Sequence, residues 1–432
     1  MMNLEKGSKK LGNAWAFYDW ANSVYSLVIS SSIFPIYYGT LFKVKGISTV
    51  QFLGIEFKNT ALISFVTAVA FLIVAFLSPI LSGIADYVGN KKRFMQFFCV
   101  LGSFSCIGLA FFTLENLTFG IFCFFFGLIG FWGSLVFYNS YLPDIAYVEQ
   151  QDRLSAKGFS MGYVGSVLLL GICLFLILGK EGEEAIFAMR ISFVLTGIWW
   201  LLFSQYTFYY LPSIKSNNKL SKNILFSGFK ELKKVGIQLS ENIVLKKYLK
   251  SFFVYSMAVQ TVMLVATYFG EQEILWQSDS QRTSGLIISI LVIQIVAVFG
   301  ALLTSLLSEK IGNIKTLIII NSIWVVICVC AYFVTLPIHF YITASFVGLV
   351  MGGIQSLSRS TYSKLLPETN DSTSFFSFYD VAEKIGIVIG MGIFASIDQI
   401  SGSMRNAIVF LALFFIVGVI LLINVQKTIN KI

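Results

Sequence analysis

Twelve blocks of mostly apolar residues, each about 20 residues long, follow one another along this chain. A helix of about 20 residues crosses a hydrocarbon core of about 30 Å, so blocks of this length predict membrane-spanning helices. Charged residues make up only 12% of the chain, against about 25% in an ordinary soluble domain. The predicted fold class is an all-α polytopic membrane protein with twelve transmembrane helices, at residues 13–42, 61–85, 94–113, 117–141, 159–178, 191–211, 252–269, 286–307, 317–336, 341–362, 375–397 and 407–425.

Lys and Arg residues are concentrated at the two termini and in every second loop between the predicted spans. This positive-inside bias places both termini in the cytoplasm. The net charge of +9 comes mostly from these membrane borders rather than from a soluble basic face. We therefore expect an integral, multi-pass monomer whose partners are a small-molecule substrate and the lipid bilayer, with no nucleic acid.

The longest polar interval, residues 212–250, holds nine lysines and separates six spans from six. We predict an N-terminal six-helix bundle at 1–211, a basic cytoplasmic linker at 212–250 and a C-terminal six-helix bundle at 251–432. Apolar residues in the linker have approximate helical spacing, which leaves two alternatives open: an amphipathic helix on the inner leaflet or a simple linker. Those residues are Phe226, Phe229, Leu232, Val235 and Leu239.

A basic turn at residues 82–93 recurs in weaker form at residues 308–315, with Glu309 aligned to Asp86 and Gly312 to Gly89. Internal repeats are how many carriers achieve alternating access, so the repeat predicts two pseudo-symmetric bundles and a transporter.

The chemistry of this turn suits a conformational gate. Asp86 stands at the inner end of its span, where it is placed to accept hydrogen bonds from the N-terminus of a neighbouring helix. Gly83 permits close approach of another helix, and Gly89 allows the tight turn. The basic run that includes Lys92 and Arg93 is expected to contact anionic headgroups. The simpler alternative is positive-inside charge following a helix, with no gating role.

The spacing of Gly83, Asp86, Gly89 and Lys92 resembles the loop between the second and third helices of the major facilitator superfamily. The runs at residues 14–23, 138–144 and 352–360 are similar to those of the vacuole-effluxer-like family of that superfamily. The resemblance implies a central cavity lined by spans one, four, seven and ten, and a bacterial cytoplasmic (inner) membrane location. Fungal members are associated with amino-acid efflux from the vacuole. Tyr87 departs from the pattern, because that position is usually Arg.

Polar residues on the presumed cavity helices are candidate substrate contacts. Span one carries a stripe of polar side chains, and such stripes must face protein or water. Asp19 within it either titrates as a proton-coupling group or pairs with a base. The candidate cavity residues are Asp19, Asn22, Ser26, Tyr138, Gln260, Gln355 and Tyr362.

Two basic residues also fall inside predicted spans. Arg359 lies at a depth near that of Asp19, so a salt bridge between the halves is predicted to close the cytoplasmic side. Lys384 lies near the membrane midplane, and Asp380, four residues earlier, can pair with it on one helix face. A purely structural pair and a role in substrate binding or coupling both stay open.

These residues together predict a secondary active transporter that moves a small polar solute by alternating access, with amino acids as one candidate class. A sugar or osmolyte symporter of the same fold is the alternative, and a non-transporting receptor or scaffold is the alternative of another class. An enzyme is not expected, because the single histidine, His339, has no acidic partner nearby and the six cysteines show no metal-ligand spacing. No metal or cofactor is expected, and proton or sodium coupling is left open.

Overall fold

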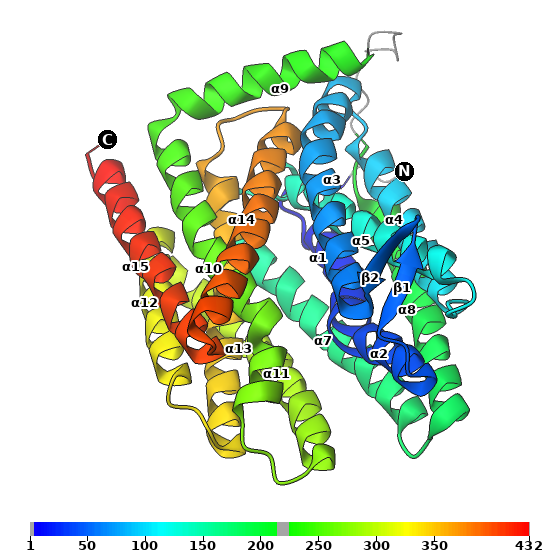
Figure 1. Cartoon of the computed structure of the whole chain (residues 1–432). Coiled ribbons are helices and arrows are strands. Elements are labelled where there is room, and N and C mark those ends of the chain that lie inside the picture. Colours follow the sequence, from blue (N-terminus) through cyan, green and yellow to red (C-terminus); the bar gives the residue numbers. More distant parts are fainter. Residues whose placement is uncertain (1–3, 214–223, 432) are drawn as a thin grey trace.

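The computed structural model describes residues 4–213 and 224–431 of the chain. Long helices run alongside one another in two groups, blue to green and green to red in Figure 1. The first group consists of α1 (Lys9–Val24), a π-helical segment (Tyr25–Ile33), α2 (Phe34–Lys45), α3 (Asn59–Val88), α4 (Lys91–Leu109), α5 (Leu117–Ser140), the short α6 (Leu142–Ile145), a 3-10 turn (Val148–Gln150), α7 (Gln151–Ile177) and α8 (Gly182–Tyr210). The second consists of α10 (Ile243–Glu273), α11 (Asp279–Ile311), α12 (Asn313–Ala331), α13 (Pro337–Leu365), α14 (Ser372–Ser401) and α15 (Met404–Ile429), and α9 (Ile224–Glu241) joins the two.

Ten helical stretches among the described residues are long and apolar enough to cross a membrane. The predicted spans at 94–113 and 375–397 correspond to α4 and α14, which are not among those ten. The basic residues at the start of α4 and the charged residues within α14 lower their apolar character. Both helices nevertheless pack within the bundles, α4 between α5 and α8 and α14 between α3 and α10. The result is the predicted all-α architecture of two six-helix bundles.

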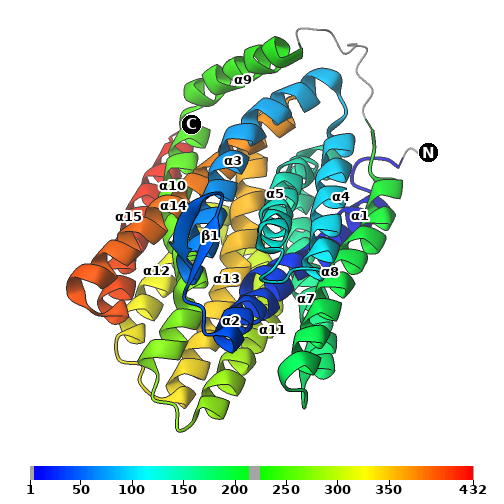
Figure 2. The same cartoon turned by 45° about the vertical axis from the view of Figure 1, so that its right-hand side comes forward.

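The first predicted span, 13–42, is not one regular helix. A π-helical segment separates α1 from α2, and Gly46 ends α2 in the left-handed conformation, with φ of 65°. A two-stranded antiparallel hairpin then pairs β1 (Thr49–Phe52) with β2 (Ile55–Lys58), beside α2 and α3 in Figure 2. Leu53 and Gly54 both have positive φ, as a tight hairpin turn requires. This hairpin was not predicted from the sequence.

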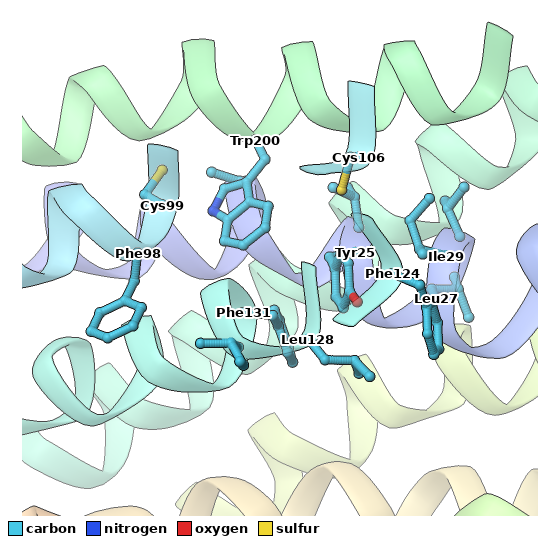
Figure 3. Close-up of a cluster of buried hydrophobic side chains, with 14 of the residues drawn as sticks. Tyr25, Leu27, Ile29, Phe98, Cys99, Cys106, Phe124, Leu128, Phe131 and Trp200 are labelled. Carbon is cyan, nitrogen blue, oxygen red and sulfur yellow. The ribbon is translucent and has the colours of Figure 1, made fainter. Parts of the chain in front are cut away.

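Buried hydrophobic side chains form two clusters, one in each group of helices. Figure 3 shows part of the first, where Trp200 of α8 lies near Tyr25 and Phe131. The ring centroids of Tyr25 and Trp200 are 5.8 Å apart, and those of Tyr25 and Phe131 are 5.1 Å apart. Gly102 of α4 makes room for Trp200, because a Cβ at Gly102 would collide with the indole ring. Close helix packing of this kind stabilises bundles in lipid, where burial from water contributes little.

Helix α9 lies across the side of the bundles on which both chain termini are found, called the terminal side below (Figure 1). Residues 214–223 of the predicted linker lie outside the described part of the chain. The predicted linker runs to residue 250, whereas α10 begins at Ile243, so the lysines at 246, 247 and 250 lie in the first turns of that helix. The helical alternative for the linker fits α9, whose Val235 is buried and Phe229 exposed, whereas the side chain of Phe226 lies outside the described residues.

A lysine of α9 connects this helix to the turn before α14. Lys234 Nζ donates to Asp371 Oδ2 at 2.8 Å and to Glu231 Oε1 at 2.7 Å. These contacts, that with Asp371 foremost, raise the pKa of Lys234 above its usual range. The lysine is therefore charged at neutral pH.

Candidate functional site

The two groups of helices meet through α7, which packs on α11 and α13, and through α14, which packs on α3 and α5. Hydrogen bonds between the two groups in the described part of the chain gather toward the terminal side, and they fall into five clusters.

The first cluster surrounds a buried ion pair. Arg359 of α13 places Nη2 3.3 Å from Asp19 Oδ2 of α1, as the sequence predicts from their equal depth. Tyr138 of α5 donates to the same carboxylate oxygen at 2.7 Å. Arg359 Nε donates to Ser155 Oγ at 2.9 Å, and the guanidinium lies 4.7 Å from the ring centroid of Trp15. The sequence left two alternatives for Asp19, titration as a proton-coupling group or pairing with a base. In the structure its carboxylate is paired with a base, Arg359.

The second cluster joins α7 to α13 and α11 further from the terminal side. Tyr163 Oη donates to Gln355 Oε1 at 2.7 Å, and Ser160 Oγ donates to the carbonyl of Val298 at 3.3 Å. Gln355 thus contacts the opposite half rather than standing alone on α13.

The remaining predicted cavity residues have different surroundings. Asn22 is fully buried, and its Nδ2 has no hydrogen-bond partner among the described residues, whereas Ser26 is half-buried. Tyr362 is enclosed, and its hydroxyl donates to the carbonyl of Phe375 at 2.6 Å. The prediction that Tyr362 lines the cavity is not met in this structure, because its only polar group serves to join α13 to α14.

The third cluster consists of charged side chains on α14. Lys384 Nζ lies 2.9 Å from Asp380 Oδ1 and 2.7 Å from Glu383 Oε2. Gln260 of α10 donates to Glu383 Oε1 at 2.9 Å, and Ser78 of α3 donates to Asp380 Oδ2 at 3.1 Å. The pairing of Asp380 with Lys384 follows the predicted spacing. Glu383 was not predicted, although a second carboxylate beside an intramembrane lysine is a signal that the sequence alone carries.

The same lysine also contacts the N-terminal half. Its ammonium lies 3.8 Å from the ring centroid of Trp132 on α5, a cation–π distance. Together with Ser78, Trp132 makes this cluster a junction between the halves.

The fourth cluster contains the basic turn, and we call its central contact the first gate, after the role that the sequence predicts for this turn. The carboxylate of Asp86 accepts the backbone N–H of Ser374 at 2.6 Å and that of Thr373 at 3.3 Å, both in the first turn of α14. A helix N-terminus carries partial positive charge, so it is a favourable partner for this carboxylate. Gly89 ends α3 with φ of 70°, as the tight turn requires, and Gly83 is buried.

The prediction that the basic run contacts lipid headgroups is wrong for Lys91 and Lys92. Lys91 is buried and donates to Asp144, to Ser372 Oγ at 3.0 Å and to the carbonyl of Ser140 at 2.9 Å. Lys92 is also buried and donates to the carbonyl of Leu211 at 2.9 Å. Both ammonium groups lie inside the protein because they bond to carbonyl groups that lack a partner at helix ends and, for Lys91, to a carboxylate. Of the three basic residues, only Arg93 is exposed.

The fifth cluster lies at the repeated turn, and we call it the second gate; its partners differ from those of the first gate. Glu309, the counterpart of Asp86, pairs with the exposed Arg153 side chain at 2.5 Å rather than with a helix N-terminus. Asp152 instead accepts from Ser308 Oγ at 3.2 Å, Asn313 Nδ2 at 2.8 Å and Lys364 Nζ at 2.5 Å. The buried acidic group that joins the halves here therefore comes from α7, and it was not predicted from the sequence.

Solved structures of other proteins identify the fold of this chain. The chain matches the E. coli fucose:proton symporter with a TM-score of 0.69 and 15% identity, covering 96% of this chain and 97% of that one. It matches a proton:xylose symporter with a TM-score of 0.68 and 14% identity, covering 95% and 94%. The fold is that of the major facilitator superfamily, so the chain is an integral, multi-pass membrane transporter and not an enzyme.

The family follows from sequence. The model of the "Vacuole effluxer Atg22 like" family matches residues 7–431, and the chain belongs to this family. A Bacillus subtilis protein, described as an uncharacterized MFS-type transporter YxiO, is 32% identical over 428 residues, which is 97% of this chain and 95% of that protein. Autophagy-related protein 22-1 of Emericella nidulans is 26% identical over 286 residues, which is 60% of this chain but only 47% of the fungal protein.

Proposed function

We propose that this chain is a secondary active transporter that moves a small polar solute by alternating access between two halves, residues 1–211 and 251–432. The observation that carries the proposal is the buried ion pair of Asp19 and Arg359, which links α1 to α13 across the interface. Charges inside a membrane are costly unless paired or hydrated. Such a pair favours two states: one in which the halves meet here, and one in which water enters and hydrates both groups.

The terminal side is proposed to be the cytoplasmic side, as the distribution of Lys and Arg indicates. The two gates and the ion pair gather there, so the structure corresponds in this proposal to a state closed to the cytoplasm. The identity to a Bacillus protein supports a bacterial cytoplasmic membrane location.

A small polar solute suits the groups between the halves. Gln355 and Asn22 offer amides. Asp380 and Lys384 offer one charge of each sign, which matches the ammonium and carboxylate of an amino acid. The name of the family, vacuole effluxer, favours export as the direction. A sugar or an osmolyte stays the alternative, because neutral amides also bind hydroxyl groups.

The test has two stages. Purified protein is first screened by thermal shift against amino acids, sugars and osmolytes, since a compound that binds the native state raises its stability. Any compound that stabilises the protein is then radiolabelled, and its accumulation in proteoliposomes is measured against empty liposomes and against Arg359→Gln. Accumulation with the parent protein supports the proposal. Selective stabilisation without movement across the bilayer would instead indicate a receptor.

A further inference from the structure

The charged cluster on α14 is unbalanced. Asp380 and Glu383 share a single ammonium, that of Lys384, whereas Asp19 and Arg359 form a one-to-one pair. With both carboxylates ionised, the α14 cluster has a net charge of −1 inside a membrane protein, where an uncompensated charge is costly.

In the part of the chain that the structure describes, no charged side chain of the neighbouring helices compensates it. Helix α14 packs on α3, α5, α9, α10 and α15, and Tyr362 of α13 also contacts it. The basic residues of α13 have partners elsewhere, since Arg359 is paired with Asp19 and Lys364 with Asp152. Residues 66–84 of α3, 117–140 of α5, 251–270 of α10 and 406–426 of α15 contain no Asp, Glu, Lys, Arg or His. Lys234 of α9 is engaged with Asp371 just before α14, more than two helical turns before Asp380. The side chain of Tyr379, on the same helix as the cluster, is an uncharged phenol.

We propose that Glu383 binds and releases one proton during the transport cycle, an inference that rests on the proposed function. One proton bound to the cluster makes its net charge zero. A proton fits there because it needs no extra space between side chains that are already in contact. Glu383 is the most accessible member, with 18% of its side chain exposed against 7% for Asp380 and 1% for Lys384. It is therefore the carboxylate best placed to exchange a proton with water.

The same geometry links this proton to the contact between the halves. Asp380 and Lys384 reach the N-terminal half through Ser78 and Trp132. When Glu383 is ionised, it competes with Asp380 for the ammonium of Lys384. When Glu383 is protonated, the ammonium of Lys384 pairs with Asp380 alone. This stronger ion pair fixes the Asp380 carboxylate in the position where it accepts the hydrogen bond from Ser78. Proton binding and the position of the halves are then coupled, and each affects the other.

Protonation is measured without any substrate by carbodiimide labelling of the full-length protein, because carbodiimides react with protonated carboxyl groups. Mass spectrometry gives the labelled fraction of Glu383 across a pH series. We expect labelling to rise as pH falls, with one midpoint. Asp380→Asn is expected to lower that midpoint and Lys384→Gln to raise it, each by about one pH unit or more, because they remove a competing negative charge and a stabilising positive charge.

These opposite shifts distinguish a titrating group from a structural one. Size-exclusion profiles confirm that each variant is folded, and Asp380→Asn retains nearly the shape of the native side chain. Labelling of Glu383 that does not vary with pH, or a midpoint that Asp380→Asn leaves in place, overturns the proposal. Protection of Glu383 by sodium ions at constant pH overturns it as well, since the site then binds a metal ion in place of the proton.

Transport assays separate this inference from the proposed function. In proteoliposomes, Glu383→Gln is expected to keep substrate exchange but to lose accumulation driven by a pH gradient. Accumulation that persists in this variant contradicts the proton role while leaving transport intact. If the parent protein transports none of the compounds that stabilise it, the proposed function fails, and the labelling titration still decides whether Glu383 takes up a proton.

Discussion

Arg359 Nη2 and Asp19 Oδ2 lie 3.3 Å apart, although 340 positions separate the two residues in the chain. The exposed fraction is 3% for the arginine side chain and 6% for the aspartate. The pair thus compensates two charges within the protein interior only while the halves meet on the terminal side. Removing one partner leaves the other buried without compensation, whereas removing both does not.

Arg359→Gln is therefore expected to open the terminal side. Breaking a buried pair costs about 3–5 kcal/mol in the closed state, and opening hydrates the remaining Asp19. The readout is labelling of a Ser356→Cys reporter, buried at the interface, by a membrane-impermeant maleimide and detected by mass spectrometry. Labelling should be faster in Arg359→Gln than in the reporter protein alone.

The double variant Asp19→Asn with Arg359→Gln is the control for this prediction. It removes both charges, so labelling should return toward the rate of the parent reporter. A single variant that labels no faster than the parent would show that the pair does not hold the halves together.

The two gates should differ in strength. Asp86→Asn removes a carboxylate from the N-terminus of α14, where a negative charge contributes up to about 2 kcal/mol. Glu309→Gln removes an exposed pair with Arg153, and such pairs contribute about 0–1 kcal/mol. The Ser356→Cys reporter should therefore respond to Asp86→Asn and hardly to Glu309→Gln. Equal responses would mean that contact with the helix N-terminus has no special role.

Asp152→Asn should weaken the second gate more than Glu309→Gln does. Asp152 is buried and accepts hydrogen bonds from three side chains, so its loss leaves the ammonium of Lys364 without a carboxylate. Thermal unfolding in detergent measures the difference, and Lys364→Met in the Asp152→Asn background should recover part of the lost stability. If the combined variant is less stable than Asp152→Asn, Lys364 has another stabilising role.

Much of the fold could be predicted from sequence, because block length and hydrophobicity decide which segments enter a membrane. Helix ends were harder: α10 begins at Ile243 although Lys246 and Lys247 make its first turns polar. The hairpin at Thr49–Lys58 was missed because its short strands leave little periodic signal, and its turn lacks the usual Asn-Gly or Asp-Gly pair.

The site was predictable where depth or spacing decides the partners. Asp19 and Arg359 lie at matched depths, and Asp380 precedes Lys384 by one helical turn. Contacts that depend on how the halves dock were not predictable. The alignment of Glu309 with Asp86 pointed to the wrong acidic residue, because the N-terminus of α7 carries its own carboxylate, Asp152, and that residue takes the buried position.

Close packing of α4 on α5 gives a prediction that is independent of transport. A Cβ built on Gly130 would lie 2.5 Å from the backbone N and Cα of Gly102 and 2.8 Å from the carbonyl oxygen of Phe98. These are backbone atoms that cannot rotate away, so Gly130→Ala must push the two helices apart. Over-packing of this kind lowers the free energy of unfolding by about 1–3 kcal/mol.

Gly171→Ala on α7 is the matched control, because no atom lies within 4 Å of a Cβ built there. Alanine favours a helix over glycine by about 1 kcal/mol, so this variant should unfold at the parent temperature or slightly above it. Thermal unfolding followed by size-exclusion chromatography compares the three proteins. Equal stability of Gly130→Ala and Gly171→Ala would mean that α4 and α5 are not held in close contact.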